Sequence, residues 1–212
     1  MLTIEDIQEM YESKCGKYDT LTDELKTVLF DEAVNEALTM NFINYWGERM
    51  YILAIDPGNT QSGYAIIEMP EFKLIDFGKI DNDELVEQIK FKLMPFQNDS
   101  EIVIEKIASY GMAVGKDVFD TCIWIGRFQQ AFDNKEVHFV YRKDEKMTLC
   151  NSMKAKDSNI RQALIDRYAK FDFKNGKGGK NKPDVFYGVS KDVWQAIAVG
   201  VTWYENNAKE NR

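Results

Sequence analysis

The first 49 residues carry apolar side chains at the spacing of amphipathic helices. Two apolar stripes occur here, and each follows a threonine that resembles a helix N-cap. Thr3 precedes the first stripe and Thr22 precedes the second. The first stripe comprises Ile4, Ile7, Met10 and Tyr11, and the second comprises Leu25, Val28, Leu29, Ala33, Leu38 and Phe42. We therefore predict that residues 1–49 form a helical accessory segment, which packs on the rest of the chain or on a partner.

From Met50 onward the pattern changes to short apolar strands alternating with helices. "YILAID", "SGYAIIEM" and "FKLIDFGKI" follow one another across Gly- and Pro-bearing turns and predict an antiparallel meander. "EIVIEKI" and "EVHFVY" predict two further strands, and helices are expected over residues 82–96, 115–132, 157–171 and 191–206. This order predicts an α/β domain over residues 50–212, with a mixed five-stranded sheet flanked by helices. The Gly/Lys-rich stretch "FKNGKGGKNKPD" is expected to be poorly ordered on its own.

Composition narrows the classes of function. The chain of 212 residues is 44% hydrophobic and 29% charged, which is typical of globular proteins. It has no apolar run of the roughly 20 residues that a membrane span needs, and its acidic start is no secretory signal. Cys15, Cys122 and Cys150 lie far apart and indicate reduced thiols in a cytoplasmic protein. His138 is the only histidine, which argues against His-rich metal sites and His-dependent triads.

The charge is distributed unevenly along the chain. Residues 1–49 hold 11 acidic and 4 basic residues, whereas residues 135–182 hold 6 acidic and 13 basic ones. A local basic surface matters more to a polyanion than the net charge of −8 does. The cations that could contact phosphates are Arg142, Lys143, Lys146, Lys154, Lys156, Arg161 and the lysines of 174–182. The alternative is a solvated surface with a flexible loop.

Three acids occupy positions where a sheet places an active site. Asp56 ends one apolar strand and Glu105 ends another, and Asp192 begins the last helix. Taken singly, they could be a turn residue, a paired strand-end charge and an early-helix acid. Taken together they form an oxygen-rich ligand set for hard cations such as Mg²⁺. Two such ions activate water and stabilise the leaving oxygen of a phosphodiester, and a bound metal would offset the charge of Asp56.

These motifs resemble those of RuvC-type Holliday junction resolvases of the RNase H-like superfamily, in particular phage and prophage members. The similar stretches are "ILAIDPGNTQSGYAII", "IVIEKIASYG" and "KDVWQAIAVGVTW", within about residues 50–206. The resemblance implies an RNase H-like fold and a homodimer in the cytoplasm of a bacterium, host- or phage-encoded. The implied activity is the nicking of branched DNA, above all four-way junctions, with Mg²⁺ or Mn²⁺.

The resemblance also implies roles for individual residues. Asp56, Glu105 and Asp192 would be catalytic metal ligands, and Gln195 stands where the family has a further ligand. Lys146 lies about where a lysine contacts the scissile region. At the place of a junction-wedging aromatic residue the chain has Ala108, with Tyr110 nearby as a DNA-binding candidate. The aromatic helix with Phe119, Trp124, Phe128 and Phe132 is expected to provide core and dimer contacts rather than a base-stacking platform.

Three alternatives remain open from the sequence. Asp-x-Gly on an opening hairpin also occurs in actin-like and sugar-kinase ATPases, although that fold needs two domains with a second phosphate loop. The second is a branched-DNA-binding or structural protein that does not cut DNA. It is considered because Gln195 places an amide where the family has a further metal ligand. The third is an RNase H-like nuclease acting on other substrates, such as RNA or replication forks. The acidic segment 1–49 is not expected to grip DNA, and another protein is one partner it could have.

Overall fold

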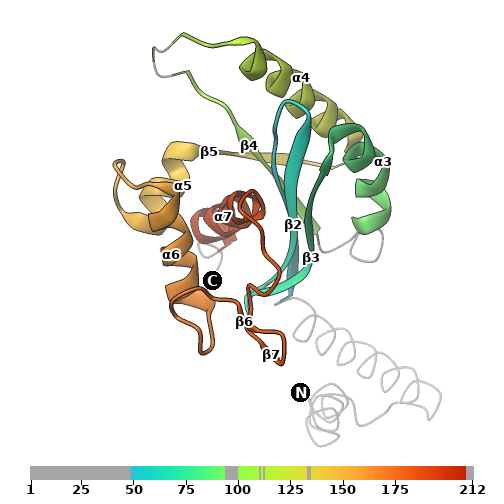
Figure 1. The fold of residues 1–212 in the computed structure, drawn as a ribbon. Helices are drawn as coiled ribbons and strands as arrows, with labels where there is room; N and C mark the ends of the chain where they lie inside the picture. Colours follow the sequence, from blue (N-terminus) through green and yellow to red (C-terminus); the bar gives the residue numbers. More distant parts are fainter. Residues whose placement is uncertain (1–48, 94–99, 110, 112, 133–134, 209–212) are drawn as a thin grey trace, which may run out of the picture. The chain divides into compact units, whose positions relative to one another are not determined.

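A mixed sheet of five strands forms the centre of the domain that begins at Met50 (Figure 1). Its strands are β1 (Met50–Asp56), β2 (Gln61–Met69), β3 (Lys73–Asp81), β4 (Ser100–Lys106) and β5 (Val137–Tyr141), in the order β3-β2-β1-β4-β5. β1, β2 and β3 pair antiparallel, whereas β4 runs parallel to β1 and β5 parallel to β4. The structure, a computed structural model, describes residues 49–93, 100–109, 111, 113–132 and 135–208. The predicted five-stranded mixed sheet is confirmed.

Helices cover both faces of this sheet (Figure 1). α3 (Asn82–Leu93) and α4 (Lys116–Ala131) pack on one face. α5 (Arg142–Cys150), α6 (Asp157–Tyr168) and α7 (Val193–Trp203) pack on the other, and a π-helical turn (Tyr204–Ala208) follows α7. The sequence pattern predicts four of these helices, but not α5.

The alternation of side chains along β1 explains the two apolar cores. Ile52 and Ala54 are buried against α7, whereas Leu53 and Ile55 are buried against α3 and α4. Because both faces are covered, β1 reads as a continuous apolar run. The same alternation assigns Asp56 to the face that carries α7.

Gly200 allows α7 to lie close to the sheet. A Cβ atom added at Gly200 would stand 3.0 Å from the Cβ of Ala54 and 2.9 Å from Cδ1 of Ile67. Real Cβ atoms do not approach other atoms so closely, so a larger residue would push the helix outward. The residue directly before this helix, its N-cap, is Asp192.

The Gly/Lys-rich stretch is ordered, which the sequence analysis did not expect. It contains a short antiparallel hairpin, β6 (Gly178–Gly179) with β7 (Lys182–Pro183). The carboxylate of Asp184 accepts hydrogen bonds from the backbone N–H groups of Lys170, Phe171, Asp172 and Val185, at 2.7–3.0 Å. The carboxylate of Asp172 accepts three more, from Asn175, Lys177 and Gly178. Two aspartates therefore hold a loop whose composition alone indicated disorder.

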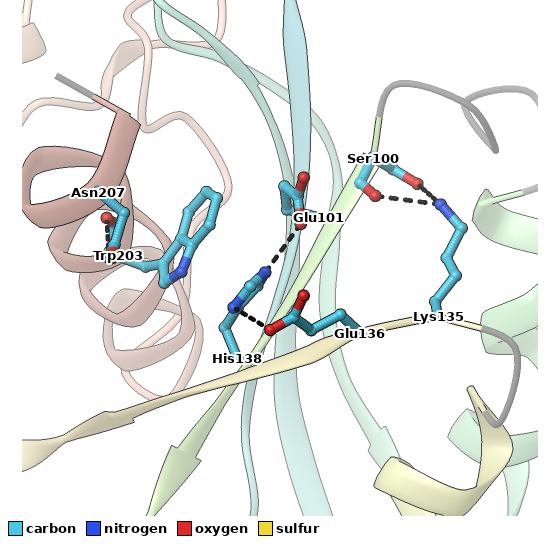
Figure 2. Close-up of polar contacts among 7 residues, drawn as sticks. All are labelled: Ser100, Glu101, Lys135, Glu136, His138, Trp203 and Asn207. Atoms are coloured by element: carbon cyan, nitrogen blue, oxygen red, sulfur yellow. Dashed lines mark hydrogen bonds and ion pairs between the residues drawn. The ribbon is translucent and has the colours of Figure 1, made fainter. Parts of the chain in front are cut away.

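The single histidine takes part in packing between β5 and α7 (Figure 2). His138 Nε2 lies 2.9 Å from Glu101 Oε2, and Nδ1 lies 4.0 Å from Glu136 Oε1. The imidazole also packs against the indole of Trp203, with ring centroids 4.8 Å apart. Glu101 belongs to the first half of β4, four residues before Glu105. His138 is thus committed to contacts away from the carboxyl end of that strand.

Several expectations fall on residues outside the described part of the chain. The predicted helices of residues 1–48 and the DNA-wedging candidate Tyr110 belong to this group. The accessory role of residues 1–49 therefore stays a prediction. In the described residues, no helix combines the length and the apolar character needed to cross a membrane.

Candidate active site

The register of the sheet brings Asp56 and Glu105 together. β1 and β4 are parallel, and their last pair is Ile55 with Ile104. Asp56 and Glu105 are the next residues of the two strands, so both side chains point to the face that carries α7. On the other side of β1, Asp56 pairs with Gly63, which in turn pairs with Lys79.

Asp192 comes close to Asp56 because Gly63, the register partner of Asp56, has no side chain. A Cβ atom at Gly63 would stand 2.7 Å from the carbonyl oxygen of Asp192. The backbone at the start of α7 therefore lies directly on β2, beside the strand that ends in Asp56. The carboxylate of Asp192 forms an ion pair with Lys79 at 3.1 Å. The three acids predicted from the sequence thus lie at one edge of the sheet.

A buried polar network holds the turn that follows Asp56. Ser62 donates to Asn82 Oδ1 at 2.6 Å and accepts from the backbone N–H of Gly58 at 3.2 Å. Asn82 Nδ2 donates back to the carbonyl oxygen of Gly58 at 2.9 Å. A Cβ at Gly58 would stand 2.2 Å from the carbonyl oxygen of Gln61, so only glycine fits this turn. The sequence analysis missed Asn82 and Ser62, whose role depends on a contact between residues 20 positions apart.

The electrostatics of the cluster favour the neutral form of Asp56. Burial, the charge of Glu105, a hydrogen bond to Glu105 and the charge of Asp192 together raise its pKa to about 9. Arg142 acts in the opposite direction. Two carboxylates can share a hydrogen bond only if one of them carries a proton. At neutral pH Asp56 therefore holds a proton, which a bound cation would displace.

Glu145 is a fourth acid, which the sequence analysis missed. It lies on α5, its side chain is fully buried, and its Oε2 accepts a hydrogen bond from Arg142 Nη1 at 2.5 Å. Burial raises its pKa well above the usual range, as do the charges of Glu105 and Asp56, while Arg142 lowers it. In the sequence Glu145 is one charge within "RKDEK", and only the unpredicted helix α5 turns it inward.

Arg142 links three elements around this cluster. Besides Glu145, its guanidinium donates to the amide oxygen of Gln195 on α7 and to Asp157 at the start of α6. The sequence analysis expects Arg142 at DNA phosphates and Gln195 at a metal. In the structure, Arg142 and Gln195 are instead hydrogen-bonded to each other.

The donor set has the chemistry that divalent cations prefer. Asp56, Glu105, Glu145 and Asp192 offer only carboxylate oxygens, the ligands of Mg²⁺ and Mn²⁺. One buried oxygen, Oε1 of Glu145, has no hydrogen-bond partner. As placed, however, no three His, Cys, Asp or Glu residues in the described part of the chain are arranged to hold one ion. The residues fit a metal chemically, while Arg142, Lys79 and a proton compensate their charge.

Two hollows adjoin the cluster. The smaller, of about 200 Å³, is lined by Asp56, the 57–61 turn, Gly63, Lys79 and Asp192. The larger, of about 530 Å³, lies between α6, the hairpin loop and the start of α7. Its charged lining is mainly basic, and it comprises Arg161, Lys174, Lys177 and Lys191, with Asp157 as the acid. We call the larger one the basic groove. It reaches the cluster through Asp157 and Gln195, the two partners of Arg142 on α6 and α7.

The other sequence candidates lie at varied positions. Arg161 lines the basic groove, with its guanidinium 5.0 Å from the ring centroid of Trp194. Lys143 is exposed and lies over the ring of Tyr141 at 5.6 Å. Lys154 and Lys156 are exposed, before and at the start of α6. Lys146 is half-buried beside Glu145 on α5, where successive residues point in different directions. Its catalytic role stays a prediction.

The fold defines a class of proteins. A sheet of order β3-β2-β1-β4-β5, with β2 antiparallel to both neighbours and helices on both faces, is an RNase H-like fold. Among solved structures, the fold is similar to that of RuvC. A structure of Thermus thermophilus RuvC in complex with a Holliday junction substrate superimposes with a TM-score of 0.60 at 12% sequence identity, covering 76% of this chain and 96% of that one.

Two other solved structures are similar. T. thermophilus RuvC itself gives a TM-score of 0.55 at 15% identity, covering 76% of this chain and 97% of that one. A Fowlpox virus resolvase in complex with Holliday junction DNA gives 0.44 at 19% identity, covering 74% and 98%. No family model matches the sequence, and no curated protein matches it either. The fold assignment therefore rests on the two RuvC structures.

Proposed function

We propose that this protein is a metal-dependent endonuclease that nicks branched DNA, with a four-way junction as its substrate. The observation that carries the proposal is the meeting of Asp56, Glu105 and Asp192 at one edge of a RuvC-like sheet. A carboxyl group whose pKa is raised so strongly beside a second acid is typical of functional sites. The presence of a Holliday junction in the similar RuvC structure supports the choice of substrate.

In this proposal Asp56, Glu105 and Asp192 hold the cations. Bound Mg²⁺ or Mn²⁺ would supply an activated water and stabilise the leaving oxygen. On binding, Asp56 must release its proton, and Asp192 must exchange its ion pair with Lys79. Lys79 then becomes available to a phosphate beside the acids. The turn at Gly58, held by Ser62 and Asn82, keeps Asp56 in place.

The basic groove is the proposed seat of the DNA backbone. Arg161, Lys174, Lys177 and Lys191 line it next to the acids, so the strand that passes through it would reach the site of cutting. Phosphate contacts of this kind provide affinity without reading sequence. The lysines at 143, 154 and 156 are exposed on α5 and at the entry to α6, and we propose that they extend this contact.

A homodimer is the proposed assembly, because a four-way junction offers two equivalent strands. Phe119 and Ile123 on α4 support it, since their side chains are 59% and 62% exposed. Phe128 and Phe132 of the same helix are buried, as expected for core residues. Light scattering on the full chain tests the assembly, and a monomer at micromolar concentration would contradict it.

A protein that binds branched DNA without cutting it is the second candidate. It is favoured by the geometry of the acids, because no three of them in the described residues are placed around one ion, and by the bond between Gln195 and Arg142. Both candidates predict binding to a junction, so binding alone does not separate them.

The experiment is a cleavage assay on synthetic DNA in about 5 mM Mg²⁺. A labelled four-way junction is compared with linear duplex, a flap and an RNA–DNA hybrid of the same sequence. We expect nicks in the junction and little product from the other three. Preferential cutting of the hybrid or flap would instead indicate a different nuclease, and junction binding without product in Mg²⁺ or Mn²⁺ would favour the second candidate.

A further inference from the structure

Glu145 has one oxygen that nothing in the described part of the protein satisfies. The side chain is fully buried, and Oε2 accepts a hydrogen bond from Arg142 at 2.5 Å. Oε1 is buried too, but it has no hydrogen-bond partner. Buried carboxylate oxygens are normally bonded, because leaving one unpaired forfeits its hydration without compensation. Such an oxygen indicates a missing partner, which must be a donor or a cation.

The position of Glu145 relates this oxygen to the acid cluster. α5 begins directly after β5, which lies beside β4 with Glu105 opposite Val140. Glu145 is the fourth residue of α5, and α5 packs against β5 and α7. Its charge acts on Glu105 and Asp56, which also accounts in part for its raised pKa. The unpaired oxygen therefore belongs to the same site as the three acids at the sheet edge.

Arg142 does not complete this site. Its guanidinium is shared among Glu145, Gln195 and Asp157, so one cation serves two carboxylates and an amide. The charge of Arg142 also acts on Asp56 and Glu105. A divalent cation would satisfy the unpaired oxygen of Glu145, which Arg142 leaves without a partner.

We propose that Glu145 is a ligand of the divalent cation, through Oε1, together with Asp56 and Glu105. This inference rests on the proposed function, and it adds a ligand from α5 that the three sequence motifs do not contain. Arg142 holds Glu145 by its other oxygen, Oε2, and so orients the ligand without occupying the oxygen that binds. The alternative role of Glu145 is purely structural, as a counter-ion for Arg142, and it predicts no effect on metal binding.

Binding of Mn²⁺ to the full chain, without DNA, separates these roles. Electron paramagnetic resonance reports free Mn²⁺, and the titration compares the wild type with Glu145→Gln, Asp56→Asn and Glu136→Gln. Glu136 is the matched control, because it is an exposed acid directly before β5, at the opposite end of that strand from α5. We expect Glu145→Gln to weaken Mn²⁺ binding by about tenfold or more, since even residues behind a ligand cost roughly 10–100-fold. Glu136→Gln should bind like the wild type.

The results distinguish this inference from the proposed function. Wild-type affinity in Glu145→Gln, with weakened binding in Asp56→Asn, overturns the role of Glu145 and leaves the metal-dependent nuclease intact. A wild-type protein that binds no Mn²⁺ at millimolar concentration overturns both. If Glu145→Gln does not fold, Glu145→Asp carries the test, because it keeps the charge that Arg142 needs and draws the carboxylate back by one methylene group. Weakened Mn²⁺ binding by that variant supports the proposal, and unchanged binding overturns it.

Discussion

Gly63 and Asp192 are in direct contact across the sheet and the last helix. The carbonyl oxygen of Asp192 lies 2.7 Å from the point where a Cβ of residue 63 would stand. Gly63 is also the register partner of Asp56. One glycine therefore determines how close an acid from residue 192 comes to the acid at residue 56, although 136 positions of sequence separate the two.

Gly63→Ala should displace the start of α7 and reduce activity. The added methyl group meets backbone atoms of Asp192 and Val193, which cannot rotate away as a side chain could. We expect a loss of stability of about 1–3 kcal/mol, typical of overpacking, together with weaker Mn²⁺ binding. Thermal unfolding and Mn²⁺ titration measure the two effects.

Gly126→Ala is the control for this substitution. Gly126 lies on α4, and its added Cβ would meet no described atom within 4 Å apart from its chain neighbours and the nearby backbone of its own helix. Alanine should stabilise that helix by roughly 0.5–1 kcal/mol and leave metal binding unchanged. Equal metal affinity in Gly63→Ala and wild type would show that Asp192 does not depend on this contact.

Asp56→Asn should stabilise the metal-free protein at neutral pH. The folded pKa of Asp56 is raised to about 9, so between its unfolded value of about 3.9 and pH 9 the folded state holds a proton that the unfolded state has lost. The contribution of Asp56 to the stability of the wild type therefore falls with rising pH across this window. Asparagine removes this dependence, so the difference in Tm between variant and wild type should grow from pH 4 to pH 9. A difference that is constant with pH would contradict the raised pKa.

Asp184→Asn should loosen the hairpin loop, and its effect should depend on pH in the opposite sense. Although burial raises the pKa of Asp184, its backbone hydrogen bonds from Asp172, Lys170, Phe171 and Val185 lower it on balance. The stabilisation is therefore present above about pH 4 and is lost as the pH falls through the lowered folded value. We expect a loss of about 1–3 kcal/mol at pH 7 that shrinks below pH 4. Limited proteolysis of the 170–186 segment at pH 7 and below pH 4 measures this loosening of the loop. Equal protection in variant and wild type at pH 7 would contradict the role of Asp184.

Removing the lysines of the basic groove should weaken junction binding. Lys174→Ala, Lys177→Ala and Lys191→Ala, combined in one chain, should also flatten the dependence of affinity on salt by roughly one unit of slope for each phosphate that the protein no longer neutralises. Gel-shift titrations at several salt concentrations measure this. Lys73→Ala is the control, since Lys73 lies at the opposite end of β3 from Lys79. An unchanged slope in the triple variant would mean that these lysines are merely solvated.

Periodicity and strand order were sufficient to predict the sheet and the position of three acids. Asp56 and Glu105 each end a buried strand, and parallel neighbours bring such ends together, so their meeting follows from local pattern. Glu145 could not be found in this way. It lies in a short polar helix whose composition gives no apolar stripe, and its inward direction depends on how α5 packs against β5 and α7.

The ordered conformation of the Gly/Lys-rich loop could not be predicted from the sequence either. Its order depends on Asp184 and Asp172, which collect backbone N–H groups from residues up to 14 and 6 positions away, respectively. The composition of the loop shows its glycines and lysines, but it does not show which backbone N–H groups donate hydrogen bonds to Asp172 and Asp184. The bonds of Arg142 to Gln195 and Asp157 have the same character, because they join three helices that the sequence does not place relative to one another.

The most direct test of the central claim measures both binding and cutting of a four-way junction by acid-to-amide variants. Asp56→Asn, Glu105→Gln and Asp192→Asn remove charge at the edge of the sheet while keeping side-chain size. We predict that the wild type nicks the junction in Mg²⁺, and that each variant binds it as tightly or more tightly but loses cleavage by more than the roughly 10–100-fold typical of changes behind a metal ligand. Cleavage at the wild-type rate by all three variants, or a wild type that binds junction and metal and leaves the DNA intact, would contradict the claim that these acids form a nuclease site.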